Sequence, residues 1–272
     1  MSNVTIAFLI TLFAGLATGI GSLIAFLARN TNKKFLSISL GFSAGVMIYV
    51  SMIEIFPKAK DSLVLALGER SGNYLTVISF FVGMFLIAII DKFVPSGENP
   101  HEVKSLPTEG SNEKNTSGLL RTGVFTALAI GIHNFPEGLA TFISALGDMK
   151  IAIPIAVAIA IHNIPEGISV SVPIYYATGD KKKAFIYSFL SGMSEPIGAI
   201  VGYVFLRNYF NDLTFGIIFA MVAGIMVFIS LDELLPAAKE YGEHHLSIYG
   251  LILGMIVMAV SLLLFNKKVV YF

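Results

Sequence analysis

The chain has 272 residues, of which 55% are hydrophobic and only 13% are charged, so it is too apolar for a water-soluble domain and is an integral membrane protein. Its 18 basic and 18 acidic residues cancel, which argues against a nucleic-acid partner and against a polybasic mode of membrane binding. It contains no cysteine, which excludes disulfides, thiolate metal ligands and cysteine nucleophiles.

Eight apolar stretches are long enough to cross a hydrocarbon core of about 30 Å, which takes roughly 20 residues of helix. They predict an all-α, polytopic membrane protein whose single transmembrane domain covers residues 1–272. The first stretch lacks the basic start of a secretory signal and is too long for one, so we expect it to be retained. The expected spans are residues 4–28, 36–57, 73–94, 119–145, 151–177, 184–206, 213–238 and 246–266.

The segment between the third and fourth spans, residues 95–118, is rich in Pro, Gly, Ser, Asn, Glu and Lys. Such a composition cannot bury a core, so it predicts a mobile loop on the cytoplasmic side. Lys and Arg are more frequent in the loops on that side, and the sharpest contrast is between residues 181–183, all lysine, and the lone Lys150 of the preceding turn. This distribution predicts that both termini lie outside the cell.

The motif His-Asn-x-Pro-Glu-Gly occurs twice, at residues 133–138 in the fourth span and 162–167 in the fifth. Its His and Glu are four residues apart, so they lie on one face of a helix and can coordinate one metal ion together. The turn near Asp148 predicts an antiparallel hairpin in which the two motifs lie at the same depth. Ionisable groups there cost about 2.5–3.5 kcal/mol each on insertion scales, so they mark a functional site.

Glu195 in the sixth span adds a third carboxylate near the middle of the membrane. A buried carboxylate either takes up a proton or binds a cation, so proton, metal and an exchange of both remain open. Two imidazoles favour a transition metal over magnesium or calcium, and the lack of cysteine disfavours copper(I). The candidate metal ligands are His133, Asn134, Glu137, His162, Asn163, Glu166 and Glu195.

A second repeat relates the flanking spans. Ser-Met-Ile-Glu at residues 51–54 recurs as Ser-Leu-Asp-Glu at residues 230–233, 179 positions later. Spans one to three and six to eight are therefore predicted to be inverted repeats around the central antiparallel pair, spans four and five, an arrangement typical of secondary transporters. Glu54 would lie toward the outer mouth and Asp232 and Glu233 toward the inner one, either on a cation path or as ordinary interfacial charges.

These motifs resemble the ZIP family of divalent-metal transporters, and most closely its bacterial zinc-uptake members. The resemblance rests on the two His-Asn-x-Pro-Glu-Gly copies, on Ser194-Glu195-Pro196 and on the two Ser-x-x-Glu segments, and it extends over all eight spans. It implies an importer in the cell membrane, not an enzyme, which works by alternating access. Its cargo would be zinc, with iron, manganese, cobalt or cadmium as further substrates.

The resemblance also implies a binuclear site. One subsite would use His133, Glu137, His162 and Glu166, and the second Asn134, Asn163 and Glu195, with Glu137 and Glu166 bridging the two. The implied partners are divalent metal ions and the lipid bilayer, without nucleic acid, and a homodimer is left open.

Other interpretations of the same residues exist. Any single His, Glu or Asn in a helix bundle can be a structural hydrogen-bonding group. A membrane metalloenzyme is disfavoured because the chain has neither the His-Glu-x-x-His of metalloproteases nor the Glu-x-x-His of di-iron bundles. A proton-coupled carrier of an organic solute, with His and Glu as a relay, is the third alternative.

Overall fold

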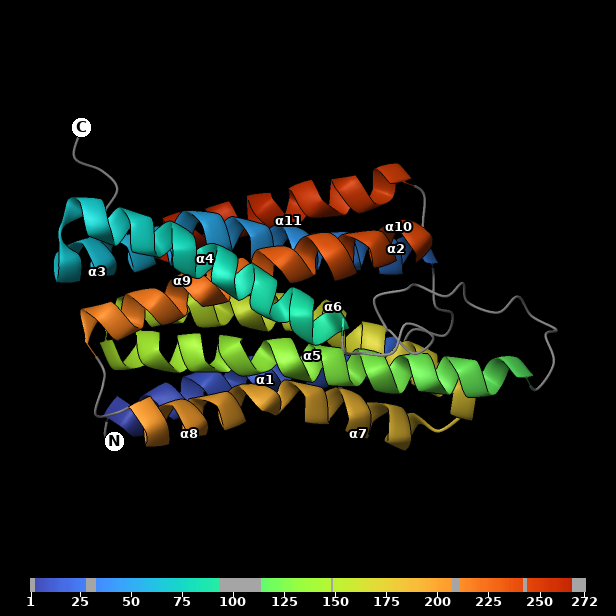
Figure 1. The fold of residues 1–272 in the computed structure, drawn as a ribbon. Coiled ribbons are helices and arrows are strands. Elements are labelled where there is room, and N and C mark those ends of the chain that lie inside the picture. Colours follow the sequence, from blue (N-terminus) through green and yellow to red (C-terminus); the bar gives the residue numbers. More distant parts are fainter. Residues whose placement is uncertain are drawn as a thin grey trace.

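The computed structural model describes residues 3–27, 33–92, 114–147, 149–206, 211–241 and 244–265. In these ranges the chain is helical almost throughout and forms a bundle of long helices, in which α1 begins and α11 ends at the same end (Figure 1). The elements are α1 (Asn3–Leu27), α2 (Lys33–Val50), η1 (Ser51–Ile55), α3 (Phe56–Leu67), α4 (Glu69–Lys92), α5 (Lys114–Gly147), α6 (Met149–Thr178), α7 (Lys181–Gly192), α8 (Ser194–Leu206), α9 (Asp212–Ile229), η2 (Ser230–Leu234), α10 (Leu235–Tyr241) and α11 (His244–Phe265).

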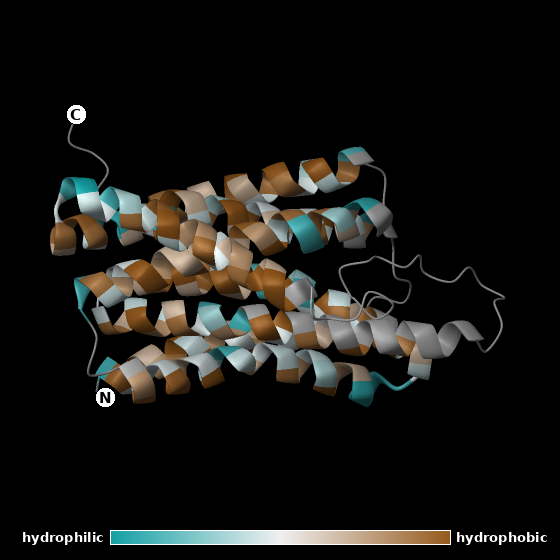
Figure 2. Cartoon of the chain, in the orientation of Figure 1, coloured by the Kyte–Doolittle hydropathy of each residue, from teal (hydrophilic) through white to brown (hydrophobic). Residues whose placement is uncertain are grey.

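Seven helical segments of the described chain are long and apolar enough to cross a membrane, and apolar residues dominate their surfaces in Figure 2. They correspond to seven of the eight expected spans. The expected fourth span lies within α5, which is 34 residues long but is not among the seven, so the eighth crossing stays a prediction. Most of the expected cytoplasmic loop lies outside the described residues, and its last five positions already belong to α5.

Local sequence explains where several helices begin and end. Gly68 and Gly179 have φ angles of 82° and 68°, a left-handed conformation that favours glycine, and they end α3 and α6. Asp180 caps α7 by accepting hydrogen bonds from the backbone N–H groups of Lys182 and Lys183, at 2.9 and 3.1 Å. Gly179 and Asp180 together form the short turn that returns the chain from α6 to α7.

Two of the long helices contain a turn of π-helix, and the two turns lie at equivalent positions of the sequence repeat. η1 covers the Ser-x-x-Glu segment that follows α2, and η2 covers its counterpart after α9. Glu54 and Glu233 are buried in these turns. Turns of this kind are rare and often occur at functional sites. Figure 1 shows that α2 and α9 run in opposite directions along the bundle.

The helix pairs α2 with α11 and α4 with α9 pack through glycines that face backbone carbonyls. A Cβ atom at any of these glycines would collide with the carbonyl oxygen opposite, so only glycine permits the observed approach. The contacts are Gly45 with Leu251, Gly254 with Phe42, Gly224 with Phe80, and Gly83 with Met221. Gly45 and Gly224 are 179 positions apart, which is the spacing of the two Ser-x-x-Glu segments, and Gly83 and Gly254 are both followed by methionine in the third and eighth expected spans. The two helix pairs are thus built in the same way although their chains run in opposite directions.

Candidate metal-binding site

Six of the seven predicted ligands have described side chains, and all six are buried, with at most 1% of their surface exposed. They come from α5, α6 and α8, and both α5 and α6 remain helical through the proline of the motif. The six are Asn134, Glu137, His162, Asn163, Glu166 and Glu195. The seventh, His133, belongs to α5, and its side chain lies outside the described residues.

Glu137, His162 and Glu166 form the first group of donor atoms. The Nε2 atom of His162 lies 3.1 Å from Oε2 of Glu137 and 3.9 Å from Oε1 of Glu166. Two atoms that bind one zinc ion at about 2.0–2.2 Å with a tetrahedral angle would be about 3.3–3.6 Å apart. The described residues nevertheless contain no preformed cluster of three or more His, Asp or Glu side chains that could hold a metal ion. The imidazole of His162 thus lies near both carboxylates, and side-chain shifts would be needed for the three groups to surround an ion.

Asn163 and Glu195 form the second group. The Nδ2 atom of Asn163 donates hydrogen bonds to a carboxylate oxygen of Glu195 and to the carbonyl oxygen of Ala14, the latter at 2.9 Å. The Nδ2 atom of Asn134 donates to the carbonyl oxygen of Ser191 at 3.4 Å. Because these partners only accept, they fix which end of each amide is nitrogen. The amide oxygens consequently point away from these partners.

Four buried oxygen atoms of the two groups have no hydrogen-bond partner among the described residues. They are Oδ1 of Asn134, Oε1 of Glu137, Oδ1 of Asn163 and Oε2 of Glu195. An unsatisfied buried polar atom costs about 1–3 kcal/mol, so four of them in one region indicate a place for a cation or water. This favours a ligand role for the two asparagines over a purely structural one.

The glycine that ends each motif has a packing role that the sequence did not reveal. A Cβ atom at Gly138 would collide with the backbone of Glu195, and one at Gly167 would collide with the carbonyl oxygen of Thr18. Glycine therefore lets α8 approach α5 and lets α1 approach α6 at the level of the ligands. The repetition of the glycine in both motifs was the only available signal for this role. The backbone partners Ala14 and Ser191 had no sequence signal.

The acidic residues expected at the two mouths differ in their surroundings. Glu54 is buried in η1, and its carboxylate accepts a hydrogen bond from Nζ of Lys58, one turn further along the chain. Glu233 is buried in η2, whereas Asp232 beside it is exposed. The pairing with Lys58 was missed in the sequence, although the spacing of four residues is the usual signal for such a pair.

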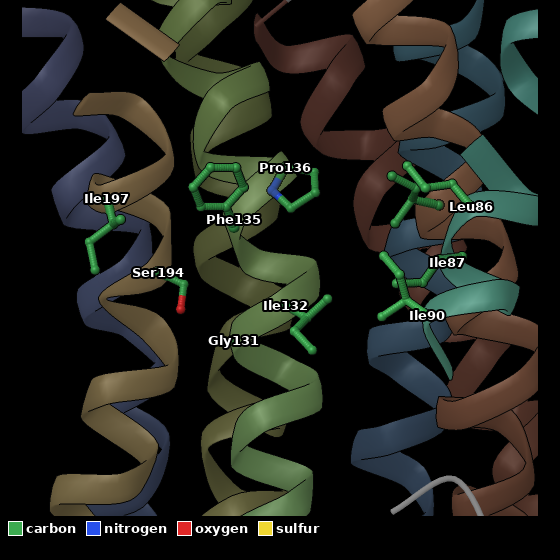
Figure 3. A pocket seen from close by; sticks show the side chains of 10 residues that line it. Leu86, Ile87, Ile90, Gly131, Ile132, Phe135, Pro136, Ser194 and Ile197 are labelled. Atoms are coloured by element: carbon green, nitrogen blue, oxygen red, sulfur yellow. The ribbon is translucent and has the colours of Figure 1, made fainter. Parts of the chain in front are cut away.

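An apolar cavity of about 470 Å³ lies beside the first motif, between α4, α5, α8 and α9. Figure 3 shows Pro136 and Ile132 of α5 on one side and Leu86 of α4 on the other, with Ser194 of α8 beyond α5. Its lining has no charged side chain, so we do not expect this cavity to bind a cation. It is lined by residues of α5 and α8 on one side and of α4 and α9 on the other.

Comparison with known proteins agrees with the motifs. The model of the family described as ZIP Zinc transporter matches residues 92–262. The Zinc transporter ZupT of Clostridium perfringens (strain 13 / Type A) is 70% identical over 278 aligned positions, which cover 97% of this chain and 98% of that protein. The proteins of the same name from Streptococcus mutans serotype c and Chlorobaculum parvum are 68% and 65% identical, and the alignments cover 95% and 97% of this chain and 97% and 98% of those proteins.

Proposed function

The chain belongs to the ZIP zinc transporter family, and we propose that it imports zinc into the cell through the site that α5, α6 and α8 form. The family consists of transporters, so the chain is a transporter and not an enzyme. The observation that carries the proposal is the buried donor set, three carboxylates and an imidazole with two amide oxygens, inside a bundle in which seven described helical segments are apolar enough to cross a membrane. This mixture of nitrogen and oxygen donors suits zinc, and it does not exclude iron, manganese, cobalt or cadmium.

The two groups of donor atoms support a binuclear site. In this proposal one ion binds to His133, Glu137, His162 and Glu166, and a second binds to Asn134, Asn163 and Glu195, with Glu137 and Glu166 bridging. The contact of His162 with Glu137 supports the first subsite, and the orientation of the Asn163 amide supports the second. Neutral imidazole and ionised carboxylates are needed for binding, so we expect zinc loading to release protons.

Alternating access is the mechanism that we propose. Its support is that π-helical turns and close glycine contacts occur on α2 and α9, which run in opposite directions, as the predicted inverted repeats require. The ligand-bearing helices also pack closely on one another and on α1, because Gly198 of α8 faces the carbonyl oxygen of Phe135 in α5, and Gly21 of α1 faces that of Ile164 in α6. They could therefore move as a unit against the remaining helices.

The orientation in the membrane follows from the lysines at the start of α7. If that end of the bundle is cytoplasmic, as the charge distribution predicts, then the end at which α1 begins and α11 ends is outside (Figure 1). With eight crossings both termini are outside, and Glu54 lies toward the outer side of the site. The bilayer is then the partner of the exposed apolar helix faces, and divalent cations are the cargo.

Uptake of radioactive zinc into proteoliposomes tests the proposal. We expect saturable uptake that excess manganese, iron(II) or cobalt inhibits and that excess magnesium leaves unchanged, because magnesium prefers an all-oxygen shell. Purified protein should also retain zinc in stoichiometric amounts. Folded, zinc-loaded protein without uptake would refute transport, and protein that binds no metal would favour the proton relay.

Replacement of Glu54 by Gln is expected to lower the rate of zinc uptake about threefold or more without changing equilibrium zinc binding. Glu54 lies in η1, outside the group of ligands, and its charge is paired with Lys58 beside the outer end of the bundle. Initial uptake rates and zinc titrations of the same preparation measure the two effects. Glu69, which is exposed at the start of α4, provides the matched control Glu69→Gln. Unchanged kinetics in Glu54→Gln would mean that Glu54 is an ordinary interfacial charge.

A further inference from the structure

A second cavity, of about 760 Å³, opens at the end of the bundle where α5 ends. It lies between α3, the last turn of α5 and the start of α9, and unlike the cavity of Figure 3 it has charged and polar walls. Asp61 and Asp212 line it and are exposed, so they give its mouth negative charge. Lys58, the partner of Glu54, belongs to the same wall. The buried end of the lining includes Ser144 of α5.

Two hydroxyl groups connect this cavity to the candidate site along one face of α5. Thr141 and Ser144 follow Glu137 by four and seven residues, so all three side chains leave the helix on the same side. At about 1.5 Å per residue the steps from Glu137 to Thr141 and on to Ser144 are about 6 and 4.5 Å. Ser144 lines the cavity and Glu137 contacts His162, so the stripe leads from the cavity to the ligands.

Neither hydroxyl makes a hydrogen bond within the part of the chain that the structure describes. Thr141 and Ser144 are 0% and 2% exposed, and their Oγ atoms have no hydrogen-bond partner among the described residues. Some buried hydroxyls elsewhere in the bundle bond to a carbonyl of their own helix, whereas Thr18, Ser51 and Ser261 likewise have no hydrogen-bond partner among the described residues. Thr11 donates to the carbonyl oxygen of Ala7 at 3.0 Å, and Thr76 donates to that of Gly72 at 2.7 Å. A buried hydroxyl group that makes no such bond indicates a partner from solution, either water or a cation.

On the other side of the site, this face of α5 carries a buried apolar side chain among those that the structure describes. Ile130 precedes Glu137 by seven residues, just as Ser144 follows it by seven, and Ile130 is buried against Val170 and Ile174 of α6. Val170 follows Glu166 by four residues and lies on the face of α6 that carries that ligand. Among the described side chains of α5, the unpaired hydroxyls on this face therefore lie between the ligands and the end of the bundle where α5 ends.

We propose that Thr141 and Ser144 are the entry route of the cation, which passes from the cavity at Asp61 and Asp212 to Ser144, then to Thr141 and then to Glu137. The route rests on the proposed zinc import and specifies which residues the ion meets before its binding site. Each hydroxyl oxygen replaces a water molecule of the ion during dehydration, while Ile130, Val170 and Ile174 close the opposite side.

Cysteine accessibility tests the route directly, because the chain has no cysteine of its own. Ser144→Cys and Thr141→Cys are to be treated in proteoliposomes with a membrane-impermeant methanethiosulfonate reagent, with and without zinc. Gly147→Cys at the exposed end of α5 shows that the reagent reaches this side, and Ile130→Cys is the matched position beyond the site. We expect labelling at 144 and 141 that saturating zinc slows at least about tenfold, and no labelling at 130 from this side.

Labelling at 147 without labelling at 144 and 141 would overturn the route, as would labelling at 130 equal to that at 141. Labelling reports access of the reagent and not passage of a cation, so zinc uptake is the second measurement. Ser144→Ala and Thr141→Val should each lower kcat/KM for zinc uptake about threefold to tenfold at unchanged equilibrium zinc binding. Thr11→Val and Thr76→Val, which remove hydroxyls that bond within their own helices, should leave kcat/KM unchanged. Wild-type protein without zinc uptake would refute the transport function itself. Wild-type uptake with normal Ser144→Ala and Thr141→Val would refute the route alone.

Discussion

Replacement of Glu166 by alanine is expected to abolish zinc uptake, with an initial rate at least about 100-fold below that of the unmodified protein. Removal of a group that only supports a ligand typically costs about 10–100-fold in metal affinity, so loss of a bridging ligand should cost at least as much. Glu166 is fully buried and lies 3.9 Å from the imidazole of His162, so no solvent-exposed carboxylate can take its place. Glu137→Ala should have the same effect.

Folding must be separated from function in this experiment. Size-exclusion profiles and thermal unfolding in detergent should stay near those of the unmodified protein, because the alanine variant removes a buried charge and leaves no larger group in its place. The loss should appear in zinc stoichiometry as well as in uptake. The exposed Glu69 in α4 supplies Glu69→Ala as a matched removal of a carboxylate. Near-normal uptake by folded Glu166→Ala would refute the bridging assignment.

Replacement of Gly138 by alanine is expected to destabilise the protein by about 1–3 kcal/mol and to impair zinc binding. The added Cβ atom would collide with the backbone of Glu195, so α8 must move away from α5 and take its carboxylate out of the site. In a helix without such a contact, alanine is more stable than glycine by about 0.5–1 kcal/mol. A loss of stability in Gly138→Ala would therefore be due to the collision.

Two other glycines of the same helix give a graded control. A Cβ atom at Gly131 would lie 3.1 Å from Oγ of Ser194, which is a side-chain atom that can rotate away, and one at Gly147 would meet no atom within 4 Å. Thermal unfolding in detergent should therefore place Gly147→Ala at or above the unmodified protein, Gly131→Ala slightly below it, and Gly138→Ala lowest. Equal unfolding temperatures for all three would show that close contact between α5 and α8 is not required.

Much of the fold and of the site was predictable because the relevant signals are local. Hydropathy over about 20 residues predicts a membrane helix, and seven of the eight expected spans coincide with apolar helices of sufficient length. The spacing of His162 and Glu166 predicts a shared helix face, and these two side chains do come together with Glu137. Family membership was also predictable from these motifs, and the comparisons confirm it. The role of His133 stays a prediction.

By itself, then, the sequence determined that this is a helical membrane protein of the ZIP family, and it predicted which residues carry the donor atoms, because hydropathy and helical periodicity act within single segments. Only the tertiary structure decided how the donors are held and reached. The bond from Asn163 to the carbonyl oxygen of Ala14 joins residues 149 positions apart, and Gly138 meets Glu195 from another helix. Likewise, a serine such as Ser144 shows its unused hydroxyl only after every neighbouring helix is in place. Such contacts depend on packing between distant segments, which no local pattern encodes.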